Sequence, residues 1–416
     1  MTELIGQKPM QARAIKASHL PFFDTVRNLA MMAVVLHHAV AAYSNTAIYW
    51  AAHDTTSLMI DGVRQILDVF MMPIFFFIAG YVALLSIRRK GSVRFLQDRL
   101  KRLGIPWLLA IFVFIPLSWY GVRATIQDNV PDGGFLSYWL AYLGDFGALQ
   151  VGPLSGLQTN QVQFWFLSLL ILIVVVFAFL YTVHGTWKKK VAQATKSLPV
   201  PKALLLFGLL TAMAYFVATL LIPDELWVMV NLLVQFQPTR TVLYVAYFGL
   251  GVYAASKKWF ADGQPPGRLG IWLSVTLLLS IALLAVGQAV FANPDTSHHL
   301  PAGLLLALAL IRSYLCLSVL VVFVSYAIKY WNKPSPFNQR LAASSYGIYL
   351  THITIIVPLQ RALMMWSGGP ALIKAGIVFF LGLAVSYGAS LLIRRFPHVT
   401  ALALIGLALL VAAITL

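Results

Sequence analysis

About eleven long apolar runs dominate this sequence, and they restrict the chain to a membrane fold. A helix needs about 20 mainly apolar residues to cross a hydrocarbon core about 30 Å thick, and each run approaches or exceeds that length. Since lipid offers no hydrogen bonds to the backbone, such runs are expected to be α-helices. They fall at 27–45, 66–87, 103–121, 163–184, 203–222, 239–256, 269–292, 303–328, 342–364, 371–393 and 398–416. The short run 225–236 is predicted to be interfacial or re-entrant.

The composition agrees with this interpretation. Of 416 residues, 60% are hydrophobic and only 10% are charged, which is too little polar surface for a water-soluble protein. We therefore predict an all-α, polytopic integral membrane bundle of about ten or eleven transmembrane helices. The single cysteine, Cys316, excludes a disulfide framework and a cysteine metal site. The histidines form no recognisable ligand set, so no metal is expected.

Charge predicts the orientation. The net charge is +17, but the basic residues gather in alternate loops such as 88–102, 188–202 and 257–268, which argues against a nucleic-acid surface. The intervening loops carry the aspartates. Because cytoplasmic loops hold the excess of lysine and arginine, the N-terminus is predicted to be cytoplasmic.

Three parts of the chain are expected. Residues 1–25 form a cytoplasmic N-terminal segment, 26–395 a membrane core, and 396–416 an additional C-terminal transmembrane helix. The outer loop 122–162 is too long for a simple connector and is rich in glycine, proline and aromatic residues. It is either a lid or acceptor platform, or a packed or disordered extracellular loop.

The first apolar run carries the best candidates for chemistry. Arg27 and His38 are eleven residues apart, so they share a helix face to within about 20° and differ in depth by about 16 Å. His38 then lies near mid-membrane, where a polar group must face protein or water. Its ordinary pKa of about 6.5 suits a general base, although a histidine that only bridges helices remains the alternative. His37 is rotated by about 100° from His38, and Asp24 is spaced to pair with Arg27.

Two further stretches have helical spacing. Arg99 and Arg102 lie one turn apart and could clamp phosphates, or they could reflect only the positive-inside bias and contacts with anionic lipid. Ser345, Tyr349 and His352 fall at i, i+4 and i+7 on one helix face. His352 is predicted to lie level with His38, with a structural histidine as the alternative.

Several charged residues fall inside apolar runs. Arg64 and Asp68 are spaced i, i+4 and are predicted to pair with each other. Arg312 is expected to face a cavity or a carboxylate, because a lone charge at this depth is costly. Arg240 and Arg361 lie nearer the outer side, where they either bind an anionic acyl group or extend to the interface.

Two apolar positions complete the candidates. Trp165 is either an interfacial aromatic residue or a pocket residue, and Gly80 lies where close helix packing needs a small residue. We group six residues as a candidate acyl or acceptor pocket: Asp68, Arg64, Trp165, Arg240, Arg312 and Arg361.

Taken together, these stretches resemble the acyltransferase-3 family of integral membrane acyltransferases. The matching pieces are Arg27 and His38 with ten residues between them, FFFIAGY at 75–81, Arg99-x-x-Arg102 followed by LGIPW, FWFL at 164–167, and SSYGIYLTH at 344–352. They occur in the family's order, and their spacing is also similar to the succinyltransferase type of periplasmic glucan synthesis. The chain departs from many members at Gln163, where they have a histidine, and the appended hydrolase-like domain of some relatives is not expected.

The resemblance implies a bacterial inner-membrane enzyme that moves an acyl group from cytoplasmic acyl-CoA to a hydroxyl of a cell-envelope or exported glycan, glycolipid or similar acceptor. Arg27 and His38 would belong to the active site, and Arg99 and Arg102 would contact the donor. Acyl-CoA is a co-substrate rather than a tightly bound cofactor. Other expected partners are membrane lipid and either a second copy of the chain or an envelope glycan assembly protein. No nucleic acid is expected.

In the corresponding mechanism, His38 removes a proton from the acceptor hydroxyl, and Arg27 orients the donor or keeps His38 neutral. Tyr349 or His352 would stabilise the thioester oxyanion. The acyl group, acetyl or succinyl, is left open.

Two other classes of protein stay open. In a transporter, His38, His352, Asp68 and Arg312 would line a pathway, but the sequence lacks the paired half-length helices of inverted-repeat transporters. In a scaffold subunit of a polysaccharide assembly complex, replacing His38 would be harmless.

Overall fold

The structure, a computed structural model, describes residues 20–125, 133–154, 157, 160–183, 198–260, 262–291 and 300–415. Each of the eleven long apolar runs is helical there. The helices are α1 (Pro21–Ala39), α2 (Leu58–Lys90), α3 to α5 with two π-helical turns (Ser92–Thr125), α7 (Trp165–Val183), α9 (Val200–Leu221), α10 (Pro238–Ser256), α11 (Leu269–Phe291), α12 (Ala302–Trp331), α13 (Pro336–Met364), α14 (Ala371–Arg395) and α15 (Pro397–Ile414). Among the described residues, nine helices are long and apolar enough to cross a membrane. The predicted all-α polytopic bundle is confirmed.

The helices α1 and α10 do not belong to those nine, because both carry polar side chains. Helix α1 contains Asp24, Arg27 and the two histidines, and α10 contains Arg240. Helix α1 is enclosed by α2, α12, α13 and α14, so its polar side chains are shielded from lipid. Helix α10 packs on α2 and α9 and keeps one face exposed, with Val245 50% exposed, while Arg240 points to the ion pairs with its neighbours.

Helices α2 and α10 approach each other through a reciprocal pair of glycines. A Cβ atom on Gly80 would lie 2.0 Å from the carbonyl oxygen of Phe248, and one on Gly251 would lie 2.1 Å from that of Phe77. No side chain fits at such distances, so the predicted packing role of Gly80 is confirmed. The close contact also brings Asp68 of α2 to Arg240 of α10, at 2.8 Å.

A small antiparallel sheet interrupts the helical fold. It consists of β1 (Leu149–Pro153), β2 (Leu226–Val230) and β3 (Val234–Phe236), in that order, with Val151 opposite Val228. The run 225–236 is thus a β-hairpin and crosses no membrane. The end of the long loop is attached to this hairpin, because the backbone N–H of Gln161 donates to Gln235 Oε1 at 2.6 Å.

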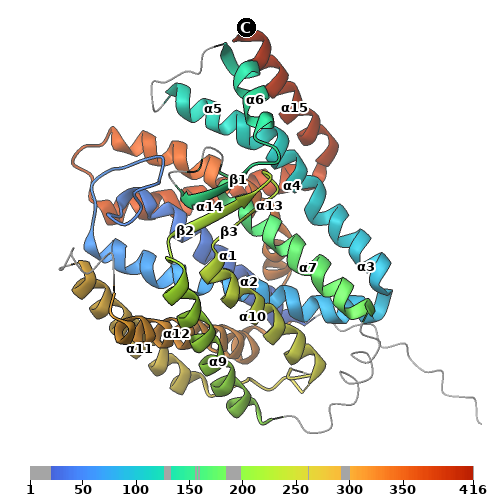
Figure 1. The fold of residues 1–416 in the computed structure, drawn as a ribbon, viewed down its shortest axis with the longest axis vertical. Coiled ribbons are helices and arrows are strands. Elements are labelled where there is room, and N and C mark those ends of the chain that lie inside the picture. The colour runs from blue at the N-terminus through green and yellow to red at the C-terminus, as the bar shows by residue number, and fades with distance from the viewer. Residues whose placement is uncertain are drawn as a thin grey trace, which may run out of the picture.

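The same loop contains a helix, α6 (Gly134–Gly144), which packs against the third span. Trp139 Nε1 donates to the carbonyl oxygen of Phe112 at 2.8 Å, and the Tyr142 hydroxyl donates to that of Ile111 at 3.0 Å. The C-terminal helix α15 lies beside α6 and α5 (Ile115–Thr125), at the end of the molecule away from α9, α11 and α12 (Figure 1). The backbone N–H of Phe135 donates to Thr415 Oγ1 at 2.9 Å, so the last helix supports the helix in the loop.

Candidate functional site

Two histidines that are 314 residues apart meet in the bundle. Nδ1 of His38, near the end of α1, lies 3.1 Å from Nε2 of His352 in the middle of α13. Helices α1 and α13 run side by side in the same direction: Thr25 and Asn28 bind Asn338 near one end, and the histidines meet near the other. His352 is fully buried, whereas His38 keeps some accessible surface. The structure therefore brings together the two histidines that the sequence placed at one depth.

Hydrogen bonding defines which nitrogen of each ring carries the proton. His352 Nδ1 lies 2.8 Å from the carbonyl oxygen of Tyr349 and 3.2 Å from that of Ile348. Because a carbonyl oxygen only accepts, Nδ1 of His352 carries the proton and Nε2 of a neutral ring accepts. His38 Nδ1 must then donate to it. This leaves the lone pair of His38 on Nε2, where it can act as a base.

Trp50 and Gln360 complete this histidine centre, and the sequence analysis missed both. The Trp50 indole stacks on the His38 ring with centroids 5.3 Å apart and planes at 19°. Oε1 of Gln360 accepts a hydrogen bond from Trp50 Nε1 at 2.6 Å. Nε2 of Gln360 donates to the carbonyl oxygens of His38 and Ala39 at 2.9 and 3.0 Å. A fully buried glutamine eight residues after His352 on the same apolar helix was the available signal.

The segment that carries Trp50 is anchored at both ends. Asp61 of α2 accepts from Ser44 Oγ at 2.6 Å and from the backbone N–H of Asn45 at 2.8 Å. At the other end, Lys374 Nζ of α14 donates to Asp54 at 2.7 Å. Burial would raise the pKa of Asp54, but the hydrogen bond and charge of Lys374 together with the hydrogen bonds from Thr55 outweigh it and hold that pKa below its usual value. These contacts fix the position of Trp50 over His38.

Three arginines gather where α1 and α13 begin, at the end that the charge pattern predicts to be cytoplasmic. Arg27 lies within electrostatic range of Arg102, and Arg99 within range of both. Arg99 ends α3 (Ser92–Arg99), and Arg102 lies in a π-helical turn (Leu100–Gly104). Arg27 also pairs with Asp24 at 3.8 Å, as predicted. We call Arg27, Arg99 and Arg102 the arginine cluster.

An open hollow of about 450 Å³ lies at this end of the bundle. Its lining comes from the first turns of α1 and α13 and the residues before them: Pro21, Asp24, Arg27, Pro334, Gln339 and Ala343. Its volume falls within the range of small-molecule sites, about 300–1,000 Å³. A ligand in the hollow would contact Arg27 directly.

Aromatic side chains lie near the histidine pair on α13. The ring of Tyr349 contacts those of Phe164, Phe166 and Tyr346, with centroids 5.8–6.5 Å apart. The hydroxyl of Tyr349 donates to the backbone carbonyl of Gln163. Gln163 itself is buried and donates from Nε2 to the carbonyl oxygen of Leu350 at 3.3 Å. In this arrangement the Tyr349 hydroxyl already donates its hydrogen bond to Gln163, so it does not point a free donor at the histidine pair.

A second polar centre, the charge network, lies among α2, α9, α10 and α12. Asp68 binds Arg240 at 2.8 Å and Arg312 at 2.9 Å. The predicted pairing of Arg64 with Asp68 is wrong, because Arg64 Nη1 instead donates to Thr46 Oγ1 at 2.8 Å. Instead, packing of α2 on α10 brings Arg240 to Asp68. Spacing within one helix cannot predict a partner on another helix. Arg312 faces a carboxylate, as expected.

Asp224 is the second carboxylate of the charge network. It lies 3.3 Å from Arg240 and 3.9 Å from Arg312, and it accepts from the hydroxyls of Tyr215 at 2.9 Å and Thr239 at 2.7 Å. Burial would raise the pKa of Asp224, but the two guanidinium groups and the two hydroxyl hydrogen bonds together outweigh it and hold that pKa below its usual value. Each acid of the network thus contacts both arginines.

The other two candidate pocket residues lie apart from the ion pairs. Trp165 packs edge to face on Trp227 of β2, with centroids 5.5 Å apart, and also contacts Tyr244 beside Arg240. Arg361 is half-buried on α13 and forms no ion pair with another described residue. Within the described ranges, no group of three or more His, Cys, Asp or Glu side chains could hold a metal ion.

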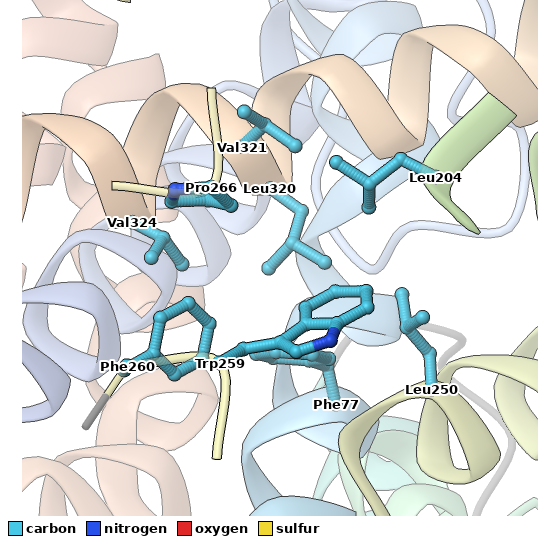
Figure 2. A pocket seen from close by; sticks show the side chains of 9 residues that line it. All are labelled: Phe77, Leu204, Leu250, Trp259, Phe260, Pro266, Leu320, Val321 and Val324. Atoms are coloured by element: carbon cyan, nitrogen blue, oxygen red, sulfur yellow. The ribbon is translucent and has the colours of Figure 1, made fainter. Parts of the chain in front are cut away.

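A cavity of about 10 Å³ lies among α2, α9, α10 and α12, with room for about one water molecule. Figure 2 shows that its lining is apolar and includes Phe77 of α2, Leu320 of α12 and Trp259 from the loop after α10. Trp259 Nε1 is a polar atom nearby, and it is buried without a hydrogen-bond partner among the described residues. This cavity contains no group suited to acid–base chemistry.

Comparisons with known proteins add the following findings. A family model described as an acyltransferase domain matches residues 20–395, from the first turn of α1 to the end of α14. A search of curated proteins and a search of solved structures found no significant match. The matched range includes the histidine centre, the arginine cluster and the charge network, and it excludes α15.

Proposed function

Because this chain belongs to the acyltransferase-3 family and is a membrane acyltransferase, we propose that it moves a small acyl group from acyl-CoA to an acceptor hydroxyl. The acyl group is acetyl or succinyl, and the acceptor is a cell-envelope or exported glycan, glycolipid or similar molecule. The donor approaches from the cytoplasm and the acceptor from the opposite side. We place the enzyme in a bacterial inner membrane.

The observation that carries the proposal is the 3.1 Å contact between His38 and His352. It leaves His38 Nε2 with a lone pair in a site that excludes most water. A base with an ordinary pKa near neutrality suits removal of a proton from a hydroxyl. A histidine that only bridged two helices would not need a stacked tryptophan and a clamped backbone around it.

The arginine cluster supports a donor site at the α1 and α13 end. Arg27, Arg99 and Arg102 place three positive charges together, with an accessible hollow beside Arg27. Guanidinium groups suit the phosphates of coenzyme A. Arg27 lies about 16 Å below His38 along α1, a distance that an extended pantetheine arm can cover.

Transfer then proceeds with one base. His38 Nε2 takes the proton of the acceptor hydroxyl while that oxygen attacks the thioester carbonyl carbon. The carbon–sulfur bond breaks, and the departing thiolate receives the proton back from His38. His352 keeps His38 in the required tautomer, and the Trp50 face stabilises the imidazolium that forms between the two transfers.

The first test is donor binding and thioester loss by the purified full-length protein, with acetyl-CoA and succinyl-CoA compared directly. The variants are His38→Ala and a matched control, His53→Ala, since His53 is exposed in the outer segment after α1. We expect saturable donor binding by all three proteins and thioester loss that only His38→Ala abolishes. Absence of donor binding by the wild-type protein would contradict the proposal and favour a transporter.

A further inference from the structure

Three buried glutamines, Gln161, Gln163 and Gln235, lie where the hairpin of β2 and β3 meets the start of α7. Their side chains are 2%, 5% and 0% exposed. In each, one end of the side-chain amide is hydrogen-bonded, and the buried other end has no partner in the described part of the chain. Buried amides are normally paired at both ends, so three half-paired amides in one region indicate a binding role. We call these residues the glutamine cluster.

The paired ends fix the orientation of each amide. Nε2 of Gln161 donates to the carbonyl oxygen of Leu232 at 2.7 Å, and Nε2 of Gln163 donates to that of Leu350 at 3.3 Å. Because a carbonyl oxygen only accepts, Oε1 is the unpaired atom in both side chains. Gln235 has the opposite orientation, since its Oε1 accepts from the backbone N–H of Gln161 at 2.6 Å. The glutamine cluster therefore offers two acceptors and one donor.

Val162 separates Gln161 from Gln163 in a strained backbone conformation. Its φ is 50°, which lies in the left-handed region that β-branched residues rarely adopt. Its N–H donates to Asn160 Oδ1 at 2.7 Å, so the turn is held locally. On either side of this turn, Gln161 binds the hairpin and Gln163 binds α13. Backbone strain of this kind concentrates at ligand-binding sites, which agrees with a binding role for the two glutamines.

The glutamine cluster lies at the depth of the histidine pair. Leu350, which binds Gln163, is two residues from His352, or about 3 Å along α13. Tyr349 joins the two sites, because its hydroxyl donates to the backbone carbonyl of Gln163 and its ring centroid lies 6.1 Å from that of His352. Helix α13 begins at Pro336, so the arginine cluster at that end lies about 21 Å away along the helix axis. A ligand on Gln163 would thus lie beside the proposed base and far from the head of the donor.

We propose that the glutamine cluster binds the hydroxyl groups of a neutral sugar, the acceptor, beside the hydroxyl that reacts at His38. A hydroxyl both donates and accepts, so neighbouring hydroxyls pair with the two amide oxygens and the one amide N–H group. An ionised carboxylate or a phosphate dianion only accepts, and it would leave both amide oxygens unpaired. This inference rests on the proposed function for the reaction, but binding of the sugar requires no turnover.

The first measurement is thermal unfolding of the full-length protein in nanodiscs, without donor, over a range of concentrations of methyl glucoside, methyl galactoside and cyclohexanol. The proteins are wild type, Gln163→Leu, Gln163→His and a control, Gln237→Leu, which removes a buried glutamine that binds the carbonyl oxygen of Asp224 instead. General stabilisation by sugars increases with concentration without saturating, whereas binding saturates. We expect at least one sugar, but not cyclohexanol, to raise Tm saturably for wild type and for Gln237→Leu.

The variants at Gln163 test its amide oxygen. Loss of one neutral hydrogen bond weakens binding about 3- to 10-fold, so the midpoint concentration of the sugar should rise by this factor in Gln163→Leu. Gln163→His keeps an N–H for Leu350 and a nitrogen that accepts, so its midpoint should stay near that of wild type. Gln161→Leu is a second variant with the same expected rise, for use if Gln163→Leu does not fold. Equal midpoints in all variants, or no saturable response of wild type to either sugar, would overturn the proposal.

The second measurement is thioester loss from acetyl-CoA as a function of the concentration of the sugar that binds. We expect Gln163→Leu to raise the KM for the sugar about 3- to 10-fold and to change kcat little. A fall in kcat with an unchanged KM would assign Gln163 to the chemical step and overturn the proposal. Sugar binding that depends on Gln163 without any thioester loss would keep the sugar site and reject the proposed enzyme.

Discussion

Two polar centres lie on different faces of α1, and they are built in opposite ways. The histidine centre, reached by His38, consists of neutral groups that form a directed series of hydrogen bonds. The charge network, faced by His37, consists of full charges that neutralise one another. One centre ends in an unused lone pair, whereas the other satisfies both of its carboxylates.

The contrast separates chemistry from support. A base must keep one nitrogen available, so its neighbours orient it without taking its last lone pair. Ion pairs among α2, α10, α12 and the segment after α9 hold these elements in register, and any missing member leaves a charge without its partner. We therefore expect substitutions in the histidine centre to lower activity and substitutions in the charge network to lower stability.

The largest effect is expected for His38→Ala. Loss of a general base lowers the rate of acyl transfer about 10²–10⁴-fold, while the folded protein persists because the side chain is neutral and partly accessible. The rate of acyl transfer and the yield of folded protein after gel filtration measure the two parts. Normal turnover in this variant would show that the histidine centre does not carry the chemistry, and the contrast between the two centres would fail.

The next effect is expected for Asp68→Asn, which leaves Arg240 and Arg312 with one shared carboxylate. The free energy of unfolding should fall by about 2–3 kcal/mol, less than the value for a fully buried pair, because these side chains are 17–30% exposed. Thermal unfolding is the measurement. The control is Asp98→Asn, which breaks a surface pair with Lys90 and should change Tm little. Equal shifts for both variants would contradict the supporting role.

A smaller effect on the rate is expected for His352, which acts through His38. His352→Leu removes the acceptor for His38 Nδ1–H and should lower kcat about 10–100-fold, comparable with losses of orienting partners in other sites. His352→Gln retains an acceptor oxygen and should recover part of the rate. If the two variants have the same kcat and the same pH profile, His352 does not determine the tautomer.

The smallest effect is expected for Trp50→Leu. The aromatic face stabilises an imidazolium by about 0.5–2 kcal/mol, so kcat should fall by roughly 2–30-fold. Trp165→Leu is the matched control, since Trp165 contacts Trp227 and Tyr244 rather than a histidine. A larger loss in the control would argue against the stacking role of Trp50.

Much of the site was predictable because helical spacing fixes direction and depth. The separation between Arg27 and His38 predicted a common face, and the positions of His38 and His352 predicted a common depth. The same spacing predicted the ion pair of Asp24 with Arg27 and failed for Arg64 with Asp68. In that case a partner on α10 competes for the carboxylate, and periodicity within one helix contains no information about such a partner.

The sequence by itself determined the membrane class and the positions of the long apolar helices, because hydropathy and helical period are local properties. Only the tertiary structure decided which polar groups meet: His38 with His352, Asp68 with Arg240 and Arg312, and Trp50 with Gln360. These contacts join residues that are up to 314 positions apart. They depend on which helices are neighbours, and that depends on packing features such as the glycine pair between α2 and α10.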